Sequence, residues 1–151
     1  MRFASSGGDV MPEYKGTDSN CFACGIRNEN GLKLKFGIID GHVEAFFETN
    51  KRFEGWDNII HGGIISTLLD EAMSHAVFRL SGDSVVTAEM NVRFIKPVLT
   101  CKRIKVLGFL DCCKGRIIET SAEIQDENGA TLAKAKGRFF KVTDKHKLEF
   151  C

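Results

Sequence analysis

Apolar and polar positions alternate along most of this chain, and a helical pattern interrupts the alternation near its middle. Residues 62–80 carry a broad apolar stripe with spacings of three and four residues, which is typical of a helix packed on a core. The stripe consists of Ile64, Ile65, Leu68, Leu69, Ala72, Met73, Ala76, Val77 and Leu80. Because Ser81-Gly82-Asp83 is a stop signal, the pattern predicts one long helix that ends there.

The flanking segments follow the period of two that is typical of half-buried strands. Residues 31–39 and 42–49 are predicted to form a hairpin around Asp40-Gly41, and the loop at 50–60 is expected to be anchored by Phe53 and Trp56. The strands expected after the helix are residues 85–95, 104–111, 116–125 and 131–142. The order β-β-α-β-β-β-β predicts an α+β fold in which an antiparallel sheet of five or six strands wraps around the helix.

Length and composition fit one domain with an ordinary core. The chain has 151 residues, of which 43% are hydrophobic, and we expect a domain at 20–142 between a flexible leader (1–19) and a charged tail (143–151). A formal net charge of +1 argues against a dedicated nucleic-acid binder. No apolar run reaches the ~18 residues of a membrane span, and the first residues lack the apolar core of a secretion signal. The expected location is cytoplasmic.

Six cysteines are present, and without a secretion signal they are expected to be free thiols. Cys21-Phe-Ala-Cys24 has the spacing of a metal-ligand or redox pair. A zinc site needs about four ligands, usually supplied as a second pair, and the adjacent Cys112 and Cys113 are poorly spaced for that purpose. A structural turn is therefore favoured over zinc or redox chemistry, and no bound metal is expected.

Candidate chemistry lies where the predicted helix begins. His61-Gly62-Gly63 opens the helix, and Asp70 lies about two turns into it. Glycines allow close approach to the backbone, and a helix start offers unpaired N–H groups that suit a polarised carbonyl oxygen. Asp70 is either an acid/base group or nucleophile, or a carboxylate with a structural role. Glu71 points about 100° away around the helix and is the weaker candidate.

Other candidates each have an ordinary structural alternative. His61 is either a general base or, as we favour, a cap that holds the glycine turn. Thr87 is either a usual strand residue or a hydroxyl that holds a water beside Asp70. Arg93 and Lys96 are solvated rim charges or contacts for a phosphate. The motifs of serine hydrolases, P-loops, dinucleotide-binding folds and H-E-x-x-H metalloproteases are absent, which leaves hydrolysis at a helix N-terminus by activated water or by a carboxylate.

Three segments together resemble a known family, over about residues 20–142. They are Cys21-Phe-Ala-Cys-Gly with Gly31-Leu-Lys-Leu-Lys-Phe, then His61-Gly-Gly with Leu69-Asp-Glu-Ala, and Thr87-Ala-Glu-Met-Asn-Val-Arg-Phe-Ile-Lys-Pro. The chain resembles the hotdog-fold acyl-CoA thioesterases, most closely their PaaI-like branch in the thioesterase superfamily. The resemblance implies hydrolysis of an acyl-CoA to a free acid and CoA, with no bound cofactor.

The resemblance also implies a homodimer, often paired into a tetramer, with sites between subunits. Gly62 or Gly63 would donate the backbone N–H, Asp70 of the other subunit would activate water or attack, and Thr87 would orient that water. Some relatives carry an upstream Asn or Gln where this chain has Gly55, so Asn58 is the candidate replacement. The alternatives are a hotdog dehydratase or hydratase, or a non-catalytic acyl-CoA-binding module.

Overall fold

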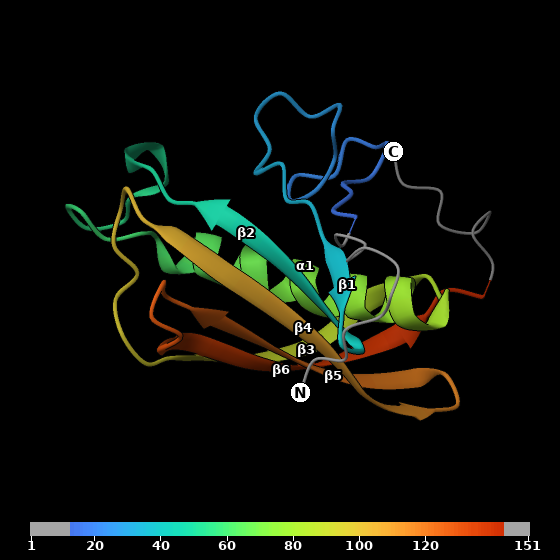
Figure 1. Cartoon of the computed structure of the whole chain (residues 1–151). Helices are drawn as coiled ribbons and strands as arrows, with labels where there is room; N and C mark the ends of the chain where they lie inside the picture. Colours follow the sequence, from blue (N-terminus) through green and yellow to red (C-terminus); the bar gives the residue numbers. More distant parts are fainter. Residues whose placement is uncertain (1–12, 144–151) are drawn as a thin grey trace, which may run out of the picture.

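Helix α1, Gly62–Ser81, lies lengthwise across one face of an antiparallel sheet (Figure 1). The computed structural model describes residues 13–143. Within them the strands are β1 (Gly37–Ile39), β2 (His42–Glu48), β3 (Val85–Phe94), β4 (Arg103–Lys114), β5 (Ile117–Gln125) and β6 (Thr131–Lys141), with a short 3-10 helix, η1 (Lys51–Phe53), after β2. The spatial order is β1-β2-β4-β5-β6-β3. The predicted sheet wrapped around one helix is confirmed.

Both ends of α1 are closed as the sequence predicts. At its start, the Gly63 N–H donates to Nδ1 of His61 at 2.8 Å, which is the capping role favoured for this histidine. At its end, Gly82 adopts the left-handed conformation with φ of 79° and donates its N–H to the Phe78 carbonyl. The helix therefore has the predicted boundaries to within one residue.

Two glycines in the sheet bring α1 close to the strands. A Cβ at Gly108 of β4 would lie 2.1 Å from the carbonyl oxygen of Ala72, so only glycine fits beneath the helix backbone there. At Gly137 of β6, an added Cβ would lie 2.9 Å from the Met73 sulfur. Ala72 and Met73 are fully buried between these strands, which fixes the depth and rotation of the helix.

The predicted first strand is wrong over residues 31–36. Only Gly37–Ile39 pairs with β2, because Lys33 has a φ of 58° that breaks the extended conformation. The alternating Leu32 and Leu34 are buried as the pattern predicts. Their N–H groups, however, donate to the Phe22 and Ala23 carbonyls at 2.8 and 2.9 Å. This segment therefore holds the N-terminal cysteine loop instead of a neighbouring strand.

The structure also bears on the loop anchors, the chain termini and membrane spans. Phe53 is buried, whereas Trp56 is 83% exposed, so the expected anchoring role of Trp56 is wrong. In the expected leader, Lys15 and Thr17 form β-bridges with Phe36 and Gly25. Residues 1–12 of the leader and 144–151 of the tail lie outside the described residues. Among the helices that the structure describes, none is long and apolar enough to cross a membrane.

Among the strands of residues 13–143, β3 lies at one end of the sheet and pairs with β6 alone. It is ten residues long, and its described side chains are mostly exposed. Apolar groups lie along this edge and just after it: Val86, Phe94 and Ile95 are 42%, 57% and 43% exposed. A long edge strand with free backbone groups and exposed apolar side chains is a surface on which another strand can pair.

Candidate active site

A β-bulge in β3 turns Thr87 toward the helix. Thr87 is opposite Phe139 of β6, and Glu89 is opposite the adjacent residue, Arg138. Strand β3 therefore advances by two residues where β6 advances by one, which is the mark of a β-bulge. Phe139 is fully buried and faces the core, while Arg138 faces outward and contacts Glu89 at 3.6 Å. Thr87 therefore shares the helix-facing side of the sheet, although simple alternation would place it on the same side as Glu89.

Thr87 and Asp70 are brought together by this geometry. The Thr87 hydroxyl donates a hydrogen bond to Oδ1 of Asp70 at 2.8 Å, across 17 positions of the chain. Burial of the carboxylate raises the pKa of Asp70 above its ordinary value, the Thr87 hydrogen bond works against this rise, and the nearby charge of Glu71 adds to it. A carboxylate whose pKa is raised suits proton transfer better than an ordinary surface aspartate.

The start of α1 offers a free backbone donor at Gly62. Nδ1 of His61 accepts from Gly63, and the His61 carbonyl accepts from Ile64 and Ile65 at 2.9 and 3.2 Å. Among the first four N–H groups of the helix, that of Gly62 is left without an acceptor in the described part of the chain. Of the two glycines that the sequence offers as donors, the geometry favours Gly62.

An apolar cleft opens beside this donor. It is lined by Gly62 together with Ile59, Ile65, Phe94, Lys96 and Pro97, among others. A Cβ at Gly62 would lie 3.6 Å from the Phe94 ring, which is ordinary contact, so the space at this position also admits alanine. Phe94 was not among the predicted site residues; its position at the strand end just before Ile95-Lys96-Pro97 is the only sequence signal for it.

The remaining predicted residues are separated. Lys96 lines the cleft, but Arg93 is opposite Lys134 and lies on the sheet face away from α1. Asn58 has a φ of 63°, its N–H donates to Glu54, and its carbonyl accepts from Thr100. Asn58 therefore closes a loop, and the described contacts give its side chain no partner in the site.

Gly62 and Asp70 lie at two different levels of α1. Eight residues of α-helix separate them, or about 12 Å along the axis. A carbonyl held at ~3 Å by a donor and approached at ~3–3.5 Å by an attacking oxygen bridges roughly 7 Å, and a base that acts through that water adds about 3 Å. The backbone separation along α1 is larger than either span.

One central helix on a six-stranded antiparallel sheet is the arrangement of the hotdog fold, and comparisons with known proteins give the family. A family model described as the thioesterase superfamily matches residues 57–133. An uncharacterized protein of Schizosaccharomyces pombe is 31% identical over 149 residues, which cover 92% of this chain and 84% of that protein. The chain belongs to the thioesterase superfamily. Acyl-coenzyme A thioesterase THEM4 of Bos taurus is 28% identical over 138 residues, covering 88% of this chain and 56% of that protein, so the chain spans about half of its length.

Solved structures confirm the predicted fold. The PaaI protein of the Escherichia coli phenylacetic acid degradation operon superposes with a TM-score of 0.67 at 15% identity, covering 74% of this chain and 80% of that one. A hypothetical thioesterase from Streptococcus pneumoniae, solved with coenzyme A, superposes with a TM-score of 0.64 at 21% identity, covering 70% and 81%. At these identities the likeness establishes the shared hotdog fold.

The raised pKa of Asp70 predicts how the stability of the protein depends on pH. Folding disfavours the charged form, so the stability linked to Asp70 is fully present below its unfolded pKa of about 3.9 and is lost as the pH rises through the folded pKa. Asparagine stays neutral throughout. We expect Asp70→Asn to have a higher free energy of unfolding than the wild type at neutral pH, with the difference vanishing in acid, in denaturant titrations across this range.

Asp83 provides a control of opposite sign. Its pKa is lowered by Lys141 and then by Ser81, so Asp83→Asn should be less stable than the wild type at neutral pH, and this difference too should vanish in acid. An Asp70→Asn protein that is destabilised at neutral pH in the same way as Asp83→Asn would contradict the environment assigned to Asp70.

Proposed function

We propose that this protein is an acyl-CoA thioesterase, which hydrolyses an acyl thioester to a free acid and CoA. The observation that carries the proposal is the pairing of Thr87 with Asp70 on a helix whose N-terminal Gly62 lines an apolar cleft. The family and its acyl-CoA thioesterase relatives support the same reaction. The coenzyme A in the structure of the Streptococcus pneumoniae protein supports the substrate class.

The proposed chemistry uses a backbone donor and a carboxylate. The thioester oxygen accepts a hydrogen bond from the Gly62 N–H, which stabilises the negative charge that develops as the carbonyl carbon is attacked. In one route Asp70 takes a proton from a water, and the water oxygen forms the new bond to that carbon. In the other route the carboxylate attacks the carbon itself and forms a mixed anhydride, which a water then hydrolyses to the free acid and the regenerated carboxylate. In both routes the carbon–sulfur bond breaks, and CoA leaves as the thiolate and is protonated.

Thr87 acts in this scheme as a positioning residue. Its hydroxyl donates a hydrogen bond to Oδ1 of Asp70. This bond orients the carboxylate and leaves Oδ2 to accept from the water. This refines the role expected from the sequence, in which the hydroxyl binds the water itself. The apolar cleft next to Gly62 accepts the acyl side of the substrate, and Lys96 at that cleft is suited to a CoA phosphate. The reaction as proposed needs no cofactor.

The distance between Gly62 and Asp70 leads us to propose a site shared by two copies of the chain. Two copies paired antiparallel along the free edge of β3 would bring the Gly62 end of one helix toward the Asp70 region of the other. Pairing would also cover Val86 and Phe94. A homodimer is thus the smallest active form in this proposal, and a dimer of dimers is compatible with it.

A hydratase or dehydratase has less support from the described residues. That chemistry calls for a histidine facing the substrate, but Nδ1 of His61 accepts from Gly63. His75 is buried on the helix, with Nε2 3.3 Å from Glu71. The thiol-release assay below distinguishes a thioesterase from a non-catalytic binding module, because the module would bind acyl-CoA without releasing free thiol.

The first test removes the carboxylate of Asp70. In a thiol-release assay over acyl-CoAs of varied chain length and aromaticity, Asp70→Asn should lower kcat by ~10²–10⁴ because the base or nucleophile is lost. Asp83→Asn is the matched control, since Asp83 also accepts a hydroxyl hydrogen bond, from Ser81, at the other end of the helix. Wild-type turnover by a folded Asp70→Asn protein would refute the role of Asp70.

The second test deletes one N–H group. Gly62 is the first helical residue, where proline is well tolerated, and His61 has the extended backbone (φ −57°, ψ 134°) that a following proline requires. Gly62→Pro therefore removes the donor while keeping the helix start, and we expect kcat to fall by ~10²–10³. Gly62→Ala, which retains the N–H, should keep most activity. Equal activity of the proline and alanine variants would show that this donor is not used.

A further inference from the structure

A second group of reactive side chains lies on α1, one residue beyond Asp70 and outside the proposed active site. Cys21, Cys24 and Glu71 each offer a ligand atom, and these three atoms lie within 4.8 Å of one another. Sequence reasoning expects no metal because the second pair of ligands is missing along the chain. The fold supplies a third ligand from a distant part of the chain, because Glu71 comes from the helix, 50 residues after Cys21.

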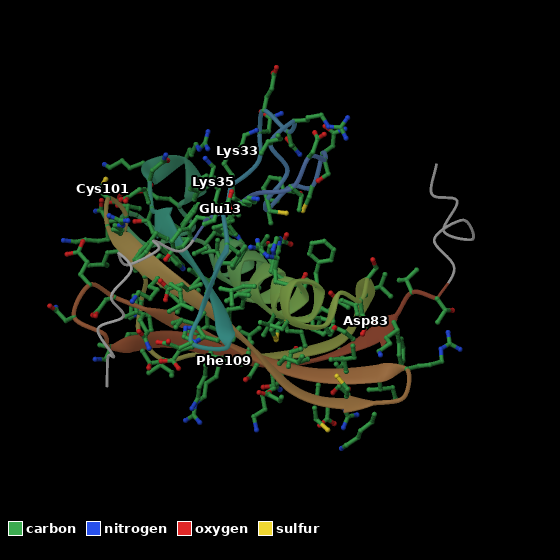
Figure 2. The ribbon with its side chains drawn as sticks, turned by 45° about the vertical axis from the view of Figure 1, so that its right-hand side comes forward. Glu13, Lys33, Lys35, Asp83, Cys101 and Phe109 are labelled. Atoms are coloured by element: carbon green, nitrogen blue, oxygen red, sulfur yellow. The ribbon has the colours of Figure 1, made fainter. Side chains whose placement is uncertain are left out.

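The loop that carries the two cysteines is a tight knuckle. The Gly25 N–H donates to the Cys21 carbonyl at 2.9 Å, which closes the turn and brings both sulfurs to one side. A Cβ at Gly25 would lie 2.4 Å from the Ser19 carbonyl oxygen, so the turn admits only glycine. In both views the N-terminal segment, marked by Lys33 and Lys35 in Figure 2, lies on the side of α1 opposite to β5 and β6 (Figures 1 and 2).

The contact between the cysteine loop and the helix has a length that fits a tetrahedral metal site. The Cys21 sulfur and Oε1 of Glu71 are 3.6 Å apart. Two ligands of zinc at ~2.3 Å (sulfur) and ~2.0–2.2 Å (oxygen) are separated by roughly 3.5 Å in a tetrahedron, and two zinc-bound sulfurs by roughly 3.8 Å. The three ligand atoms therefore need to move little to share one ion.

The surroundings of the carboxylate resemble the outer shell of a metal site. Nε2 of His75 lies 3.3 Å from Oε1 of Glu71 one helical turn away, and the His75 ring stacks on Phe36 with centroids 4.4 Å apart. His75 is 4% exposed, and its Nδ1 has no hydrogen-bond partner among the described atoms. A buried histidine that holds a ligating carboxylate in place is a usual outer-shell arrangement.

Burial and neighbouring groups shift the pKa values of two of the three ligand groups in opposite directions. Burial, followed by the hydrogen bond and charge of Glu71, raises the pKa of the Cys24 thiol. Burial also favours the neutral form of Glu71, but hydrogen bonds from His75 and the cysteines outweigh it and lower the net pKa of that carboxyl. The cluster therefore holds a carboxylate next to one buried thiol, Cys24, and one half-buried thiol, Cys21.

We propose that Cys21, Cys24 and Glu71 bind a zinc ion, with His75 positioning the Glu71 carboxylate. Thiolates select zinc over hard cations such as magnesium and calcium. The three ligand residues line one cleft, with Thr17, Ser19 and Ser74 around them, so a fourth position is open to a water. Binding releases the two thiol protons and ties the N-terminal segment to α1 beside Asp70.

The test is metal analysis of the full chain purified without chelator, together with titration of the metal-free protein by zinc and by cobalt(II). Stoichiometric zinc and the visible absorption of tetrahedral cobalt thiolate are expected. Cys21→Ser and Cys24→Ser should abolish both signals, and His75→Phe, which keeps the stacking on Phe36, should weaken zinc binding by ~10–100-fold. Cys113→Ser changes an exposed thiol elsewhere and should leave both unchanged.

Two results would overturn the proposal. One is wild-type protein that takes up no zinc while both cysteines remain reactive thiols or form a disulfide with each other. The other is zinc bound equally well by Cys21→Ser or Cys24→Ser. Because the cobalt spectrum and thiol reactivity are measured on the wild type, the proposal is decided even if a cysteine variant does not fold. The thiol-release assay is independent, so failure here leaves the proposed thioesterase activity standing.

Discussion

The depth at which α1 sits in the sheet is the constraint on which the rest of the structure depends. Gly108 leaves no room for a side chain, with an added Cβ only 2.1 Å from the Ala72 carbonyl oxygen, so the helix backbone rests on β4. Ala72 directly follows Asp70 and Glu71, and its fixed position sets the direction of both carboxylates. A helix that is held this closely cannot rotate to exchange one for the other.

The adjacent carboxylates of Asp70 and Glu71 consequently lie in different surroundings. Asp70 faces the bulged edge strand, where burial raises its pKa and one hydroxyl hydrogen bond partly offsets the rise. Glu71 is turned about 100° away toward the cysteine loop, where several donors outweigh burial and lower its pKa. In our account, the first is a base for thioester hydrolysis and the second is a ligand. Environment, more than residue type, separates the two roles.

The sequence predicts the regular elements well because each has a strong period of its own. The apolar stripe of α1 and the four alternating strands after it are found nearly where they are expected. The first strand fails because Lys33 adopts a left-handed backbone, which alternation alone does not indicate. The family was also predictable, because His61-Gly62-Gly63, the Asp70 spacing and the strand that ends in Lys96-Pro97 are specific when they occur together.

The site is less predictable because it depends on irregular and long-range geometry. The bulge next to Ala88 moves Thr87 to the helix side, which reverses what simple alternation implies, and Arg93 is left on the outer face. The choice between Gly62 and Gly63 as donor rests on where the His61 ring points. Likewise, the contact of Cys21 with Glu71 spans 50 residues and leaves no local pattern.

The central claim, that Gly62 of one chain works with Asp70 of another, is tested most directly by mixing inactive subunits. After subunit exchange, Asp70→Asn and Gly62→Pro chains should form heterodimers with one intact site, restoring about a quarter of wild-type activity in an equal mixture. Mixing wild type with the Asp70→Asn/Gly62→Pro double variant should instead give heterodimers without activity. No recovery in the first mixture, with half-active heterodimers in the second, would place both groups in one chain and contradict the account.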